Sequence, residues 1–231
     1  FISTAYILVS LLLLNTNSAT AQTTYCPNAD FEMGNFNNWL GFTGQFFQLP
    51  TVPTPGIVPG RHTIIPSPAL PATDPNTCNN LQITPAFVGG YVCQLGNQNT
   101  GAETERLTYD IQVDSNNALF VYHYAVVLQD PNHSAPEQPN FRIEAVDSAD
   151  NPIDSICGSY FVQSAANIPG FQSCGTTRWK DWTTVGINLS AHIGHLVTLK
   201  FTTADCSQGG HYGYAYIDCY CIPMEIQTEF C

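Results

Sequence analysis

The sequence predicts an all-β protein, an antiparallel β-sandwich, and three observations carry that prediction. After residue 21, no apolar pattern of helical period continues for a useful length. Short runs rich in β-branched and aromatic residues alternate instead with clusters of Gly, Pro, Asn and Asp. Hydrophobic residues make up 44% of the 231 positions and charged residues only 10%, so a packed core is expected rather than disorder.

The chain opens with a candidate export signal. Residues 5–14 (AYILVSLLLL) form an apolar run too short to cross a bilayer as a helix, and a membrane anchor is the alternative interpretation. Ala19-Thr20-Ala21 matches the small-residue pattern after which export peptidases cut. We therefore expect residues 1–21 to be a signal peptide, Gln22 to begin a secreted or cell-surface protein, and further residues to precede Phe1.

The strands that follow can be placed from their composition. In chain order, the expected strands are residues 30–32, 63–65, 90–95, 105–113, 119–128, 141–147, 183–188, 196–203 and 212–220. The proline-rich stretch 48–85 suits a long surface connection. Asp150-Asn151-Pro152 predicts a turn into a partner strand near 153–156. We therefore expect residues 22–222 to form one sandwich domain and residues 223–231 to begin a linker or another domain.

Two of these strands are apolar on both faces. Residues 119–128 read LFVYHYAVVL and residues 212–217 read YGYAYI, without the alternation of a half-exposed strand. Because neighbouring side chains point to opposite faces, one face packs in the core while the other is covered or lines a groove. Small residues accompany His123 and His211 on one face of each strand, which leaves room for a ligand or a loop.

The cysteines indicate a disulfide-containing, exported domain, because disulfides form in oxidising compartments. The nine are Cys26, Cys78, Cys93, Cys157, Cys174, Cys206, Cys219, Cys221 and Cys231. The pairs we expect, each enclosing one loop-rich excursion, are Cys78–Cys93, Cys157–Cys174 and Cys206 with Cys219 or Cys221. A zinc site is the alternative, but no C-x-x-C occurs.

The charge balance narrows the partners. Eighteen acidic residues against six basic ones give a formal net charge of −12. Nucleic acid and anionic lipid would be repelled by such a chain, so we expect no nucleic-acid binding and no membrane insertion after signal removal. Divalent cations and neutral ligands such as glycans remain compatible with it.

Particular residues carry a family resemblance. The opening Asn28-Ala-Asp-Phe-Glu-Met-Gly34 with Trp39, and the closing Ala215-Tyr-Ile-Asp218, resemble the first and last strands of jelly-roll carbohydrate-binding modules of the galactose-binding-like type. Other segments resemble the N-terminal domain of large Bacteroidota surface proteins with PKD or immunoglobulin-like repeats and gliding-motility-type sorting domains. These segments are residues 95–97, 103–109, 126–131, 137–141, 179–182 and 201–218. The resemblance implies a jelly-roll domain at the front of a modular adhesin.

The resemblance also implies a structural calcium ion. In such modules an acid of the first strand and one of the last hold calcium away from the sugar groove, and the matching residues are Glu32 and Asp218. Asp30 is a third candidate. Two carboxylates with backbone carbonyls can supply the six to eight oxygens that calcium takes. The alternative is that these acids lie at solvated strand ends.

The candidate ligand-binding residues are histidines, tryptophans and their charged neighbours. His123 and His211 lie beside small residues, with Arg142 and Asp205 as expected neighbours. Trp179-Lys180-Asp181-Trp182 has the mixture of flat rings and polar groups that a sugar platform uses, although both tryptophans could equally belong to the core. Core histidines satisfied by hydrogen bonds are the alternative for the imidazoles.

Three functions remain open. The first is a non-catalytic module that binds polysaccharide or a surface glycan. The second is a structural domain that caps or spaces repeats and binds nothing small. The third is a hydrolase, which the missing G-x-S-x-G and H-E-x-x-H motifs disfavour, so no catalytic residue is assigned. A platform of aromatic rings on an open sheet would favour the glycan-binding module. A groove filled by the protein's own loops would favour the structural domain, and a close, buried pair of acids would favour the hydrolase.

Overall fold

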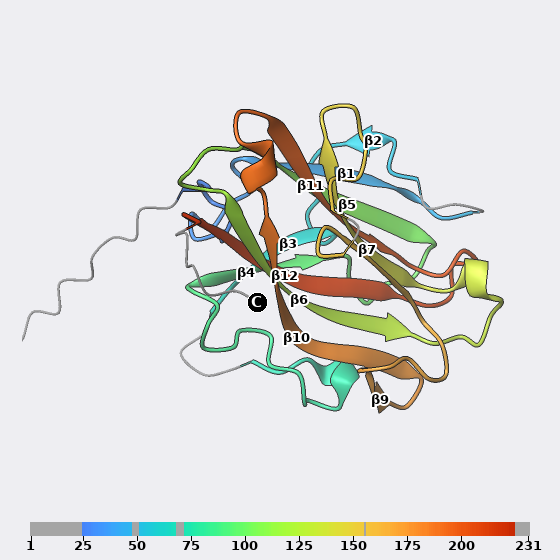
Figure 1. Ribbon diagram of the computed structural model, residues 1–231. Coiled ribbons are helices and arrows are strands. Elements are labelled where there is room, and N and C mark those ends of the chain that lie inside the picture. The colour runs from blue at the N-terminus through green and yellow to red at the C-terminus, as the bar shows by residue number, and fades with distance from the viewer. Residues whose placement is uncertain (1–24, 48–50, 68–71, 155, 225–231) are drawn as a thin grey trace, which may run out of the picture.

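The predicted jelly-roll β-sandwich is confirmed. A computed structural model describes residues 25–47, 51–67, 72–154 and 156–224, and these form two six-stranded antiparallel sheets. In Figure 1 the central strands of one sheet run below those of the other. The expected signal peptide, residues 1–21, lies outside the described residues, as does most of 223–231.

Each sheet mixes strands from distant parts of the chain. In spatial order the first sheet contains β2 (Thr54–Pro55), β1 (Trp39–Gln45), β5 (Glu103–Gln112), β11 (Leu196–Ala204), β7 (Asn140–Asp147) and β8 (Ser159–Gln163). The second contains β3 (His62–Pro66), β4 (Tyr91–Leu95), β12 (Gly213–Ile222), β6 (Leu119–Gln129), β10 (Thr177–Asn188) and β9 (Gln172–Cys174). Short 3-10 turns are η1 (Pro75–Thr77), η2 (Ala135–Glu137) and η3 (Ser190–His192). Among the described residues, no helix is long and apolar enough to span a bilayer.

The inner faces of the two sheets enclose the main core. Leu107 and Phe201 from the first sheet meet Phe120, Tyr122 and Ile217 from the second, and all are buried. These side chains occupy alternate positions on their strands, because the pleat sends every second side chain inward. Burying a side chain of this size stabilises the fold by about 1.5–3 kcal/mol relative to exposure.

The opening motif forms a pinned loop, not the strand expected at 30–32. The buried Asn28 side chain donates to the carbonyls of Asn35 and Asn37 and accepts from the Met33 amide. This loop turns Phe31 inward, where its ring stacks on Trp39 at a centroid distance of 4.7 Å. Local side-chain bonds of Asn to backbone groups compete with strand pairing, which explains the difference.

The other differences are β1, which was not expected although it lies inside the first sheet, β10, which begins at Thr177 and not at 183, and strands at the sheet edges. A partner strand was expected near 153–156, but the described residues 153, 154 and 156 belong to no strand, and β8 at 159–163 pairs with β7. Residues 151–152 join β7 through an isolated bridge from Pro152 to Val146 and through hydrogen bonds between Asn151 and Asp147. Edge strands as short as β2 and β9 carry too few residues for a pattern of period two to identify them.

The disulfides differ from the expected pairs. Cys26 bonds Cys221 and Cys78 bonds Cys174, at Cα–Cα distances of 5.5 and 5.7 Å. Cys93, Cys157, Cys206 and Cys219 are thiols. The expected pairs joined cysteines that are close in sequence. Cys78 and Cys93 cannot pair because Cys93 points into the main core and Cys78 lies on the outer side of the second sheet. Cys206 precedes the start of β12, and Cys221 lies near its end.

The Cys26–Cys221 bond joins the two ends of the domain, 195 residues apart. A cross-link over so long a loop restricts the unfolded chain strongly. We expect the double variant C26S/C221S to lose about 2–5 kcal/mol of unfolding free energy, measured by denaturant titration. Peptide mapping without reductant should recover Cys26–Cys221 and Cys78–Cys174 as linked peptides. Recovery of a Cys78–Cys93 peptide would contradict this pairing.

Candidate functional site

The outer face of the second sheet is covered by the protein's own chain. Residues 72–90 cross it (Figure 1), and Leu81 and Val88 pack there on Ala125, Val127 and other apolar side chains. This face is therefore a second core. It explains why β6 and β12 are apolar on both sides.

Polar bonds hold this covering segment in place. The Asp74 carboxylate accepts hydrogen bonds from the hydroxyls of Tyr214 (2.7 Å) and Tyr216 (2.9 Å). Cys78, at the end of η1, is bonded to Cys174 on the edge strand β9. Burial raises the pKa of both tyrosines, so they stay protonated and keep donating.

His123 lies under this cover and not in an open groove. Its Nδ1 is 2.8 Å from the Thr184 hydroxyl, and the Phe87 ring packs on the imidazole at 4.7 Å between centroids. Burial lowers the pKa of His123, which favours the neutral ring. Of the two interpretations of His123, a ligand contact or a core histidine satisfied by hydrogen bonds, these neighbours favour the core histidine.

The two tryptophans have different surroundings, and neither offers the sugar platform that was expected. Trp179 is only 2% exposed, within the second core, so it cannot stack on a ligand from solvent. Trp182 is partly exposed and lies at a break in register in β10. Its indole Nε1 donates to the carbonyl of Gln82 in the covering segment (2.7 Å), and the ring packs against Phe87.

The remaining predicted ligand residues lie in two other places. Asp205 is buried between strands, where its carboxylate accepts from the amides of Glu103 (3.1 Å) and Gly213 (3.1 Å). His211 is in the loop between β11 and β12, beside Cys206. Arg142 is exposed on the first sheet. The structure therefore does not bring the six residues together, and Arg142 is not a neighbour of His123.

Arg142 belongs to a row of side chains across the outer face of the first sheet. The strand registers place its members directly opposite one another. From β1 to β8 the row reads Phe42, Arg106, Thr202, Arg142 and Phe161. Neighbouring strands lie about 4.8 Å apart, so the row is about 19 Å long. Two aromatic rings thus flank two guanidinium groups and a hydroxyl.

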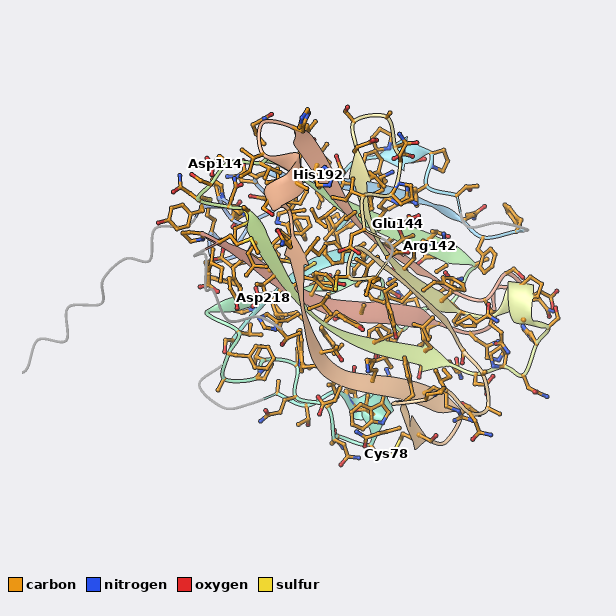
Figure 2. All side chains as sticks on the ribbon, viewed as in Figure 1. Cys78, Asp114, Arg142, Glu144, His192 and Asp218 are labelled. Carbon is orange, nitrogen blue, oxygen red and sulfur yellow. A yellow bond between two sulfur atoms is a disulfide. The ribbon has the colours of Figure 1, made fainter. Side chains whose placement is uncertain are left out.

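The central strands form a groove along this row. Its volume is about 350 Å³, and its lining residues are Arg106, Asn140, Arg142, Glu144, Val146, Asp150, Pro152, Lys200 and Thr202. Figure 2 shows Arg142 and Glu144 on β7, well apart from Asp218 of the second sheet. Three of the six basic residues in the sequence line this one groove.

Contacts within the groove fix its polar groups. Arg106 Nε donates to the Thr202 hydroxyl at 2.9 Å, and Arg142 lies 3.6 Å from a Glu144 oxygen. Lys200 is paired with Asp150. The Arg142 guanidinium also lies 4.8 Å from the centre of the Phe161 ring, which is 50% exposed. Two of the three cations are thus paired with acids, and the groove presents directed donors and acceptors beside an open aromatic ring.

The sequence carried a signal for this groove that was not used. Charged or hydroxyl residues occupy every second position of β5 (Arg106, Thr108, Asp110) and of β11 (Thr198, Lys200, Thr202). That alternation marks a face that is not buried in a core. Only Arg142 was identified, because composition alone does not say which strands lie side by side.

The three candidate metal-binding acids lie near one another but do not form a ligand trio. The charges of Asp30 and Glu32 raise the pKa of Asp218, after the larger effect of burial, to about 8. Asp218 Oδ1 is buried without a hydrogen-bond partner in the described part of the chain. Glu32 is exposed, and its carboxylate accepts from the amides of Gly90 (2.9 Å) and Tyr91 (3.1 Å). Of Glu32 and Asp218, Asp218 is therefore the acid with a buried oxygen that no hydrogen bond satisfies.

A buried pair of acids does exist, at the start of β5 and the end of β11. Burial raises the pKa of Glu105 to about 7 and of Asp205 to about 8. Glu105 accepts from Arg61 Nε (2.7 Å) and from the Thr203 hydroxyl (3.0 Å), while both Asp205 oxygens accept backbone amides. These bonds join strands and occupy the oxygens that a general acid or base would use.

The chain was then compared with known proteins. No protein-family model and no curated protein match it. Among solved structures it is similar to the carbohydrate-binding module TmCBM61 in complex with β-1,4-galactotriose (10% identity, TM-score 0.42, covering 87% of this chain and 98% of that one). A family 11 carbohydrate-binding module of Clostridium thermocellum gives 12% identity and a TM-score of 0.33, covering 84% and 91%.

An enzyme fragment is also among these structures. The enzymatically active domain of tailspike protein 4 from bacteriophage CBA120 gives 10% identity and a TM-score of 0.41, covering 86% of this chain and 21% of that one. Likenesses this distant transfer no residue to this chain.

The state of Asp218 predicts a pH dependence. Its pKa of about 8 in the folded protein exceeds 3.8, so between these values the folded state holds the extra proton and stability falls as the pH rises. The slope for one such group is at most about 1.4 kcal/mol per pH unit. In chelator, D218N should show a shallower fall in unfolding free energy from pH 5 to 7 than the parent chain. D110N, at an exposed acid, is the control, and equal slopes for D218N and the parent would refute this.

Proposed function

We propose that the protein is a non-catalytic glycan-binding module whose binding face is the outer face of the first sheet. The observation that carries the proposal is the cross-strand row ending in Phe42 and Phe161, with Arg106, Thr202 and Arg142 between them. Flat rings stack on the apolar faces of sugars, and guanidinium and carboxylate groups bond hydroxyls, which both donate and accept. This arrangement supports an extended polysaccharide lying across the strands.

The charges of the groove favour a neutral polysaccharide over an anionic one. Arg142 has Glu144 beside it and Lys200 has Asp150, while Arg106 donates to the Thr202 hydroxyl, so two of the three basic residues are paired with acids. The chain as a whole carries −12 and repels anions. Binding through directed hydrogen bonds and stacking also depends only weakly on salt. The expected export signal and the two disulfides support placing such a module outside the cell.

A purely structural domain is the second candidate, and a specific observation favours it. The segment 72–90 packs on the outer face of the second sheet and fills most of it with the protein's own side chains. The same reasoning does not extend to the first sheet, where Phe161 and Arg142 are exposed. Binding by the first sheet and a structural role for the second are compatible within one adhesin domain.

Variants of the row test the binding proposal on an array of neutral and acidic polysaccharides. R142Q removes a charged donor, and we expect at least about a tenfold loss of affinity for the bound glycan, measured by titration calorimetry. F161A should weaken binding several-fold because a stacking surface is lost. K180Q on β10 and F47A, an exposed ring outside the row, are the matched controls.

Three results would overturn this assignment. If the parent chain binds no polysaccharide on the array, the purely structural domain is the function that remains. Loss of affinity only in Q94A, beside the covering segment, moves the site to a depression of about 310 Å³ lined by Gln94, Tyr214 and Tyr216. A preference for acidic polysaccharides that disappears in high salt refutes a neutral ligand.

The proposal includes a structural calcium ion at Asp218. The partnerless Oδ1 of Asp218 and the neighbouring charges of Asp30 and Glu32 fit a cation at this place. Asp218, Asp30 and nearby backbone carbonyls would hold the ion, with Glu32 as a more distant charge because its oxygens accept amides. The ion would neutralise the buried carboxylate and stay apart from the glycan groove.

Calcium should therefore stabilise the parent chain and not D218N. Ligand binding to the folded state raises the melting temperature as the ligand concentration passes its dissociation constant. We expect millimolar calcium to raise the melting temperature of the parent by several degrees, read by calorimetry, and chelator to reverse the rise. D110N should behave like the parent. An equal rise in D218N would place the ion elsewhere.

A further inference from the structure

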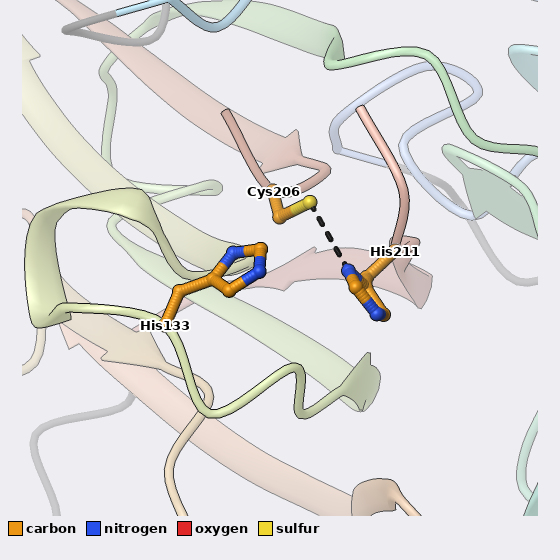
Figure 3. Close-up of side chains that lie close together, drawn as sticks. All are labelled: His133, Cys206 and His211. Atoms are coloured by element: carbon orange, nitrogen blue, oxygen red, sulfur yellow. Dashed lines mark hydrogen bonds between the residues drawn. The ribbon is translucent and has the colours of Figure 1, made fainter. Parts of the chain in front are cut away.

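Three metal-ligating side chains meet at an end of the sandwich that neither proposed site uses. His133 comes from the loop between β6 and β7, and Cys206 and His211 come from the loop between β11 and β12. Their potential ligand atoms all lie within 4.8 Å of one another. Figure 3 shows both imidazoles directed toward the Cys206 sulfur. Two loops distant in sequence thus converge on one thiol.

The distances suit a tetrahedral metal ion with sulfur and nitrogen ligands. Cys206 Sγ and His211 Nδ1 are 3.4 Å apart. With zinc bond lengths of about 2.3 Å to sulfur and about 2.0–2.1 Å to nitrogen, tetrahedral ligands lie about 3.3–3.6 Å apart. His133 and His211 have ring centroids 5.2 Å apart and planes at 85°. Only a small inward movement of His133 is needed to complete the set.

The loop between β11 and β12 is built around the Cys206 sulfur. The Cys206 amide donates to the His211 carbonyl (2.9 Å), and the Gly209 amide donates to the Cys206 carbonyl (2.9 Å). Gly209 has φ +73°, a conformation open to glycine, which lets the chain turn back within a few residues. The Gly210 amide then donates to Sγ at 3.3 Å. Such a bond stabilises a metal-bound thiolate.

His133 is fixed by its own loop, and one of its nitrogens has no use within the fold. The Gln138 side chain donates to the His133 carbonyl (3.1 Å) and to Asp130 (3.4 Å), which holds the backbone there. Nδ1 of His133 is buried and has no hydrogen-bond partner among the residues described. A hydrogen bond between Cys206 and His211 alone accounts for that pair and leaves this nitrogen unexplained. Buried polar atoms without partners often mark an ion or water site.

From this convergence we infer that His133, Cys206 and His211 bind one zinc ion, with a fourth position open to water. Thiolate and imidazole select zinc, whereas calcium takes oxygen ligands, so this site and Asp218 would hold different ions. Binding releases the thiol proton and forms a bond from sulfur to the metal. The ion would join the two loops and protect from oxidation a thiol that no disulfide uses.

Cobalt(II) is the probe, because a thiolate ligand gives it a charge-transfer band in the near ultraviolet. The full chain, without a histidine tag or reductant, is titrated with cobalt under argon and then with zinc. We expect one cobalt per chain, the charge-transfer band, and loss of the band when zinc displaces cobalt. C206S should abolish the band, and H133Q and H211Q should each weaken metal binding at least about tenfold.

Matched variants separate this site from other thiols and imidazoles. C157S removes another cysteine without a disulfide, and H192Q removes a histidine of η3, so both should keep the band. Far-ultraviolet circular dichroism and melting without metal establish that C206S is folded. Absence of a stoichiometric band in the parent, or a band retained in folded C206S, would overturn the site. Glycan and calcium binding are measured on the same samples, and their loss or retention is independent of this result.

Discussion

Everything in this structure depends on the alternation of side chains along a strand, which gives each sheet two faces that must both be satisfied. The inner faces satisfy each other. The two outer faces differ. The outer face of the second sheet is apolar and is covered by residues 72–90, whereas the outer face of the first sheet carries polar side chains that water can solvate. The division between a closed face and an open one decides where a ligand can bind.

The sequence predicted the sandwich because its strongest strands are long and bounded by turn residues. Residues 119–128 and 212–220 correspond to β6 and β12, and their doubly apolar character was correctly interpreted as a core on one side and a cover or groove on the other. Whether the outer face of these strands is covered or lines a groove depends on where the proline-rich connection 48–85 lies in the folded protein. That placement follows from long-range contacts, such as Asp74 with two tyrosines, which no local pattern contains.

The candidate site was the least predictable part for the same reason. Arg142 was identified, but the row that gives it a role joins five strands from residue 39 to residue 204, most of them not consecutive in the chain. The predicted disulfide pairs were wrong for the same reason. Cys26–Cys221 and Cys78–Cys174 connect segments that are distant in sequence, whereas each expected pair enclosed a short segment. Cys206 was expected in a disulfide, and the structure places it beside two histidines instead.

The direction of the row has a consequence for how such a domain can vary. A ligand lying across five strands touches side chains set by backbone pairing and not by the loops at the strand ends. Insertions and deletions in those loops would leave the recognition surface intact, whereas a slip of one residue in β5, β7 or β11 would turn its members into the core. Specificity could then diverge by exchange of single side chains on an unchanged scaffold, independently of the loops at the strand ends.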